Sequence, residues 1–205
     1  GSASDIATAA SADSAGTLAL AANFGATVSA GAVDAADLIT IYGQTSATIN
    51  ATAATGINGS AANVHTVIDH AQVNHDTNFT VSISGTSAAA ADLKAIDAIT
   101  SGVITATGVE TITGSLSDVG DVVDVDTDTS SAGQQIDIDT NFTVTLSDTG
   151  NMSASALNTL NGKVPGTLTV TNAVTLTGTA SDIATAASAD SAGTLALAAN
   201  FGATV

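Results

Sequence analysis

The chain has 205 residues, of which 44% are hydrophobic but only 2% aromatic, and it contains no cysteine. Nineteen acidic residues oppose two basic ones, which gives a formal net charge of -17. This charge disfavours nucleic acid and anionic lipid surfaces as partners, and the scarcity of bulky side chains favours thin stacked layers over one large core. Uncharged segments are interrupted by glycine, serine and threonine, so we expect no membrane insertion.

A long internal repeat is the strongest feature of the sequence. Residues 1–28 return as residues 178–205 with one difference, Ser2 against Thr179. The offset of 177 residues predicts that residues 1–177 form one full period of a tandem array and that residues 178–205 begin the next period. In such a protein the function belongs to the array more than to any single residue.

Each period contains six short repeats of about thirty residues. In chain order, alternating β-branched residues predict strands, a glycine predicts a turn, and an alanine-rich stretch after Ser, Thr or Asp predicts a capped short helix. The copies span residues 26–41, 55–68, 80–96, 110–123, 143–160 and 174–187. One apolar residue anchors each predicted helix, and the alternating spacing of these anchors groups the repeats into three pairs. The anchors are Leu38, Val64, Leu93, Val119, Leu157 and Ile183.

Two strands and one short helix cannot bury an apolar side alone, but copies stacked in register can. The sequence therefore predicts an α/β solenoid, a parallel β-solenoid with strand–strand–helix coils and six coils per period. At about 4.8 Å per coil, one period would advance the chain by about 29 Å.

A phenylalanine follows an asparagine in a matching context in every second coil. We predict that Phe24, Phe79 and Phe142 form an aromatic column inside the solenoid. The preceding Asn23, Asn78 and Asn141 are expected to bond neighbouring backbone at a corner of the coil. A binding role is the alternative for these residues, and the structural role is favoured.

An acidic cluster is the best candidate for a metal site. Carboxylates two residues apart on an extended chain can converge on calcium, although the sequence has neither an EF-hand loop nor a glycine-rich calcium nonapeptide. A solvated acidic loop is the favoured alternative, and calcium is the only cofactor considered. The candidate ligands are Asp121, Asp124, Asp126, Asp128, Asp137 and Asp139.

Other polar residues do not form a recognisable site. His65, His70 and His75 are five residues apart, which does not place them on one helix face, so we expect surface histidines. There is no GxSxG motif and no arginine, so we predict that the protein is not an enzyme. Regular Thr-x-Thr pairs are similar to those of ice-binding solenoids, but the strand propensity of threonine also explains them.

The segments SAAAADLKAIDAITSGVITATGVETITGS (87–115) and ASALNTLNGKVPGTLTVTNAVTLTGTASDIATA (154–186) carry a resemblance in repeat style. The chain resembles the repeat regions of giant secreted bacterial surface proteins, in the style of marine cyanobacterial, adhesin-like and haemolysin-type exoproteins. The resemblance implies export by a one-step secretion system and a place on the cell surface in adhesion, a surface layer or motility. The calcium-binding nonapeptides of such proteins are missing here.

These features predict an extracellular structural protein that forms a fibre, stalk or surface-layer element by end-to-end stacking of coils. Its partners would be neighbouring periods of the same chain and identical chains arranged head to tail. The alternative is an adhesin module that binds glycans or surfaces through variable loops, with residues 124–134 as the candidate contact.

Overall fold

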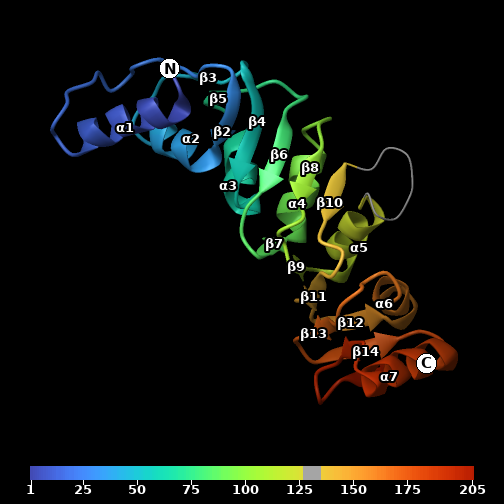
Figure 1. Ribbon diagram of the computed structural model, residues 1–205. Helices are drawn as coiled ribbons and strands as arrows, with labels where there is room; N and C mark the ends of the chain where they lie inside the picture. The colour runs from blue at the N-terminus through green and yellow to red at the C-terminus, as the bar shows by residue number, and fades with distance from the viewer. Residues whose placement is uncertain (127–134) are drawn as a thin grey trace. The chain divides into compact units, whose positions relative to one another are not determined.

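The computed structural model describes residues 1–126 and 135–205 and contains two compact units. The first comprises residues 1–84 and 95–106, and the second comprises residues 85–94 and 107–205. In both units parallel strands alternate with short helices, which confirms the α/β class (Figure 1). None of the described sheets is closed. These units do not correspond to the predicted periods. That residues 1–177 form one period of a tandem array and residues 178–205 begin the next stays a prediction.

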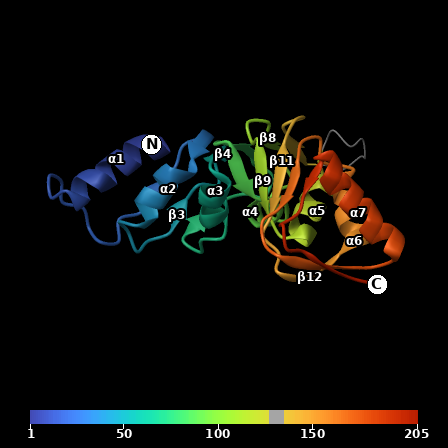
Figure 2. The same cartoon turned by 90° about the horizontal axis from the view of Figure 1, so that it is seen from below.

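In the first unit two parallel sheets have the strand orders β1-β3-β5 and β2-β4-β6-β8. Helices α1 and α2 lie side by side in it (Figure 2). The helices are α1 (Ala3–Ser14), α2 (Ala35–Tyr42) and α3 (Ala61–Ile68), and the last three residues of α4 (Ala90–Asp97) also belong here. The strands are β1 (Ala26–Thr27), β2 (Gly31–Asp34), β3 (Ile49–Asn50), β4 (Ala54–Gly59), β5 (Val73–Asn74), β6 (Thr80–Ile83) and β8 (Ile104–Ala106).

In the second unit the sheets have the orders β7-β9-β11-β13-β15 and β12-β14-β16. Helices α6 and α7 pack side by side (Figure 2). The helices that lie wholly in this unit are α5 (Leu116–Asp124), α6 (Ala154–Asn161) and α7 (Ala180–Ala192). The strands are β7 (Ser87–Ala89), β9 (Thr111–Gly114), β10 (Ile136–Ile138), β11 (Thr143–Leu146), β12 (Gly150–Ser153), β13 (Leu168–Val170), β14 (Val174–Thr177), β15 (Leu195–Ala196) and β16 (Gly202–Thr204).

The helices begin where the sequence places their caps. Ser60, Ser115 and Thr179 each accept a hydrogen bond from the backbone N–H three residues later, which satisfies one otherwise unpaired donor of the first turn. All six predicted anchors lie within helices, and five of them are completely buried. Ile183 of α7 is half-buried.

Stacked aliphatic side chains form the core between sheet and helices. Along one sheet of the second unit, successive register partners place Ala88, Ile112, Val144, Leu168 and Leu195 in a row. All five side chains are buried. Burying a Val, Leu or Ile side chain contributes about 1.5–3 kcal/mol, so these rows are the main source of stability.

Alternate short repeats differ in how the chain enters its helix. Before α4 and α6 the chain forms three strands instead of the predicted two. Gly85 lies just ahead of the third strand β7 and Gly150 is the first residue of the third strand β12, and both turn the chain with positive φ. Before α3 and α5 the turn lies next to the helix cap, where Gly59 and Gly114 have φ of 149° and 154°. The position of the glycine turn therefore accounts for the pairing of the short repeats.

Gly114→Ala should destabilise the protein by about 1–3 kcal/mol, because only glycine adopts this backbone region without strain. A Cβ at this position would also lie 3.3 Å from the Cβ of Ala90. Urea denaturation measures the loss. Gly108→Ala is the matched control, since a Cβ there meets nothing within 4 Å. Equal stability of both variants would contradict the requirement for glycine at residue 114.

Candidate functional site

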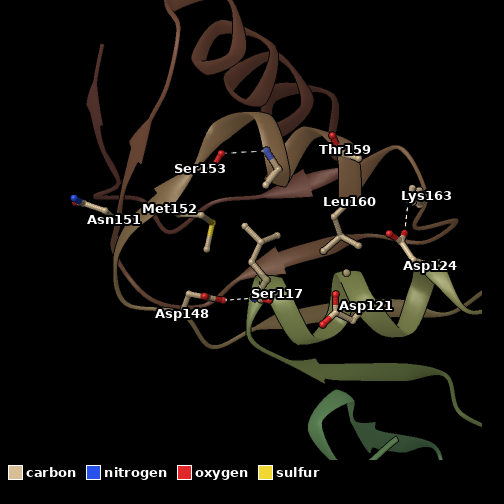
Figure 3. A pocket seen from close by; sticks show the side chains of 13 residues that line it. Ser117, Asp121, Asp124, Asp148, Asn151, Met152, Ser153, Thr159, Leu160 and Lys163 are labelled. Atoms are coloured by element: carbon tan, nitrogen blue, oxygen red, sulfur yellow. Dashed lines mark hydrogen bonds and ion pairs between the residues drawn. The ribbon is translucent and has the colours of Figure 1, made fainter. Parts of the chain in front are cut away.

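A groove of about 580 Å³ lies between α5 and α6 in the second unit (Figure 3). Met152 and Leu160 are buried and give it an apolar floor. Asp121, Asp124 and Lys163 line it with exposed charged groups. The groove therefore combines a small apolar surface with carboxylates, which suits a polar ligand with one apolar face.

Asp148 joins the loop after β11 to the start of α5 beside this groove. Its Oδ2 accepts a hydrogen bond of 2.7 Å from the backbone N–H of Leu116 (Figure 3). A carboxylate at a helix N-terminus is favourable, because it meets unpaired N–H groups and the positive end of the helix dipole. The carboxylate of Asp148 thus has a structural role at the groove.

The two lysines of the chain both pair with carboxylates of α5. Lys94 Nζ lies 3.1 Å from Asp118 Oδ1 and 2.7 Å from Asp121 Oδ2, and Lys163 pairs with Asp124. These pairs lie at the surface, with Asp118 half-buried, so water and salt screen them and they contribute little to stability. The hydrogen bond from Ser115 Oγ, followed by that from Lys94, holds the pKa of Asp118 below its ordinary value.

Ser115→Ala should lower the free energy of unfolding at pH 7 by about 1 kcal/mol, because it removes the N-cap of α5. The variant also removes the bond that lowers the pKa of Asp118, whose ordinary value is 3.8. The stabilisation from that shift is complete above the unfolded-state value and disappears as pH falls through the folded-state pKa. Urea titrations at pH 7 and pH 3 should therefore show a smaller loss at pH 3.

Ser117→Ala is the control for this experiment, since Ser117 is an exposed residue in the same helical turn. A loss that is equal at both pH values would show that Asp118 is not coupled to Ser115.

The predicted acidic cluster is divided among different partners. Asp121 and Asp124 pair with lysines, whereas buried Asp126 accepts a hydrogen bond of 3.1 Å from the backbone N–H of Ile138. Asp137 lies on β10, and Asp139 accepts from the backbone N–H of Asn141 at 2.7 Å. Asp128 lies outside the described residues. Among residues 1–126 and 135–205, no three His, Asp or Glu side chains gather as a metal-binding group, and calcium binding stays a prediction.

The phenylalanines lie at equivalent corners but in different degrees of burial. Phe79 and Phe142 are buried and Phe24 is half-buried. The residues next to each phenylalanine do not show which polar group binds the backbone there. In the structure the hydroxyls of Thr45 and Thr100 donate to the carbonyl oxygens of Phe24 and Phe79. The side chains of Asn23, Asn78 and Asn141 are exposed. The aromatic column stays a prediction.

The predicted surface histidines are in three environments. His70 stacks on Tyr42 with ring centroids 3.9 Å apart, and His75 packs its ring edge-on against Phe79 at 5.2 Å. Both ring nitrogens of His75 lie within 3.0 Å of backbone carbonyl oxygens, those of Asp76 and Ile68. His65 lines a shallow pocket with His70. The structure thus does not bring the three histidines together in the manner of a metal site.

Threonines on neighbouring strands face each other in register. Thr111 pairs with Thr143, with their hydroxyl oxygens 3.1 Å apart, and Thr113 pairs with Thr145, which pairs with Thr169. These side chains are half-buried. Their arrangement follows from the parallel register of the strands, and a role in binding ice stays untested.

Sequence reasoning missed the threonine corner and the groove. A Thr-Ser-Ala or Thr-Ser-Gly triplet begins 21 residues after Phe24 and Phe79, at Thr45 and Thr100. This recurrence was the available signal for the corner. The groove depends on side chains that are far apart in the sequence, and no local pattern indicates it.

The chain was compared with family models, with curated proteins and with solved structures, and none of them matches it. In the described part of the chain no helix has both the length and the apolar character needed to cross a membrane.

Proposed function

We propose that this chain is a segment of a structural repeat protein, in which short repeats wind as the coils of an α/β solenoid. The array would form a fibre, a stalk or an element of a surface layer outside the cell. Support comes from the parallel register of the strands, through which successive short repeats add strands to the same sheet. Short helices and small residues allow the coils to stack closely.

The observation that carries this proposal is the behaviour of the duplicated sequence. Both copies form a helix with the same cap, Ser2 accepting from Asp5 and Thr179 accepting from Asp182. Both also close with the same bond, because Gly1 N donates to Thr27 O and Gly178 N donates to Thr204 O. The capped helix and the closing bond are thus alike in the two copies, whether another repeat follows or precedes them, as an array requires.

The charge of the chain suits this role. A net charge of -17 in 205 residues repels neighbouring fibres and keeps a long polymer from clumping. The same repulsion acts between coils and is reduced by salt, over a Debye length of about 8 Å at physiological ionic strength. Divalent cations would act in the same direction, which leaves calcium as a proposed modulator.

Small-angle scattering of chains with one, two and three periods tests the proposal. Stacked coils predict a constant increase in length of about 29 Å for each added period. A larger or irregular increase, with flexibility between periods, would mean separate modules on a string and would exclude a continuous solenoid.

The groove between α5 and α6 favours one alternative, an adhesin module. It lies beside the end of α5, where residues 124–134 begin, and it offers both carboxylates and an apolar floor. Glycan-array binding that is lost on Met152→Glu, but kept on Gly108→Ala, would support this function. Absence of binding to any glycan would count against it.

A further inference from the structure

The two copies of the repeated sequence, residues 1–28 and 178–205, bury different sides of the same helix. In the first copy α1 packs on the helix that follows it, α2, and buries Ala3, Ala7 and Ala10. In the second copy α7 packs on the helix that precedes it, α6, and buries Ala186. The counterparts of Ala3 and Ala7 in α7, which are Ala180 and Ala184, are exposed. One sequence therefore has two contact faces, and each copy covers only one of them.

The strands of the two copies use opposite edges. β1 pairs with the following strand β3, with Thr27 opposite Asn50. β16 contains the counterparts of both β1 residues and pairs with the preceding strand β14, with Thr204 opposite Thr177. A strand inside a parallel sheet can pair along both edges at once. The two pairings are thus compatible within one copy.

Gly1 lies where a preceding strand would end. In the second copy, Gly178 directly follows β14 and donates its N–H to Thr204 O at 3.3 Å. In the first copy, the terminal amino group of Gly1 donates to Thr27 O at 3.1 Å. A chain that continues ahead of Gly1 with the residues of β14 would therefore run directly along the free edge of β1.

A leucine marks the surface that this continuation would cover. Leu195 is 0% exposed, because β15 pairs with β13 and places it beside Leu168. Its counterpart Leu18 is 42% exposed, among the few large hydrophobic side chains on the surface of the described residues. The first copy thus exposes an apolar side chain at the place where the second copy contacts the preceding repeat.

We propose that residues 1–28 form the joint between consecutive periods and are covered by residues 154–177 of the preceding period. The proposal rests on the proposed function and specifies how the array is joined. Since β1 and β16 are the same strand in two copies, the three-stranded sheets β12-β14-β16 and β1-β3-β5 become halves of one sheet, β12-β14-β1-β3-β5. This sheet has five strands, as does the sheet β7-β9-β11-β13-β15.

Cross-linking in a two-period chain, residues 1–177 followed by residues 1–205, tests the joint. Cysteine is absent from the sequence, so introduced pairs are unambiguous. The first pair is Thr177→Cys in the first period with Thr27→Cys in the second, and the second pair is Thr27→Cys with Asn50→Cys, both in the second period. We expect a short bis-maleimide to join both pairs. The 205-residue chain with Thr177→Cys and Thr204→Cys is the positive control, because those residues face each other.

A distance control separates the joint from chance proximity. Thr8→Cys of the second period is nearer in sequence to Thr177 than Thr27 is, but it lies exposed on α1 and should not be joined. If the second pair forms and the first forms no more than this control, the proposed joint is overturned.

Leu18→Asp gives a second, independent readout. In the second period of the two-period chain it should abolish the first cross-link and keep the second, because Leu18 is buried only at the joint. In the 205-residue chain, where Leu18 is exposed, the same substitution should leave the Thr27–Asn50 cross-link and the Tm unchanged. An unaffected first cross-link would contradict the proposal.

Failure of the joint and failure of the fibre are distinguishable. If the length measured by scattering increases by a constant amount per period but the first cross-link does not form, the array is a fibre whose periods are joined in another way. An irregular increment with the first cross-link would leave the joint intact and exclude a continuous solenoid.

Discussion

Phe142→Ala should lower the free energy of unfolding by about 3–5 kcal/mol, the usual cost of removing a buried aromatic ring. Phe142 is 3% exposed, and its carbonyl accepts a hydrogen bond from the N–H of Gly166, which lies after α6. Neighbouring backbone is therefore held against the residue and cannot close the cavity freely. For a protein of this size the loss corresponds to a decrease in Tm of roughly 6–20 °C, measurable by circular dichroism.

Phe24→Ala is the matched comparison. Phe24 also follows an asparagine, and its carbonyl also accepts a hydrogen bond, but it is only half-buried, so the loss should be clearly smaller. An unchanged Tm for Phe142→Ala would show that the ring does not contribute to the core. Equal losses for both variants would show that burial does not determine the cost.

The helices could be predicted because their signals are local. A cap residue, an acid three positions later and an apolar anchor all lie within one or two turns, as in Ser115, Asp118 and Val119. The third strands β7 and β12 could not be predicted in the same way. They arise because Gly85 and Gly150 turn the chain earlier, and the φ of a glycine is not visible in its identity.

The environment of the acidic residues could not be predicted, because it depends on distant residues. Lys94 is 24 residues from Asp118, and Lys163 is 39 residues from Asp124. The sequence gives the excess of carboxylates, but only the stacking of α5 against its neighbours decides which of them meet a lysine. The alternation of apolar and polar residues in the strands could be predicted from the sequence, since Ile112, Val144 and Leu168 each lie between polar residues that point away from the core.

Leu195→Ala should lower the free energy of unfolding by about 2–5 kcal/mol, whereas Leu18→Ala should change it by no more than about 0.5 kcal/mol. Both leucines lie in the same local sequence, so helix propensity, strand propensity and the unfolded chain are matched. The two leucines differ in the strand beside them. Leu195 lies opposite Leu168 of β13 and is 0% exposed, while Leu18 is 42% exposed. Thermal unfolding of the two variants measures the difference in stability.

The same pair of substitutions distinguishes burial by stacking from an intrinsic property of the repeat. If both variants lost the same stability, this leucine would stabilise the repeat through contacts within the repeat itself. The neighbouring strand would then make no contribution. If stacking is responsible, Leu18→Ala placed in the second period of a two-period chain should become as costly as Leu195→Ala. The change in cost with context would then measure the contribution of one coil to the next, the quantity that determines the stability of a long array.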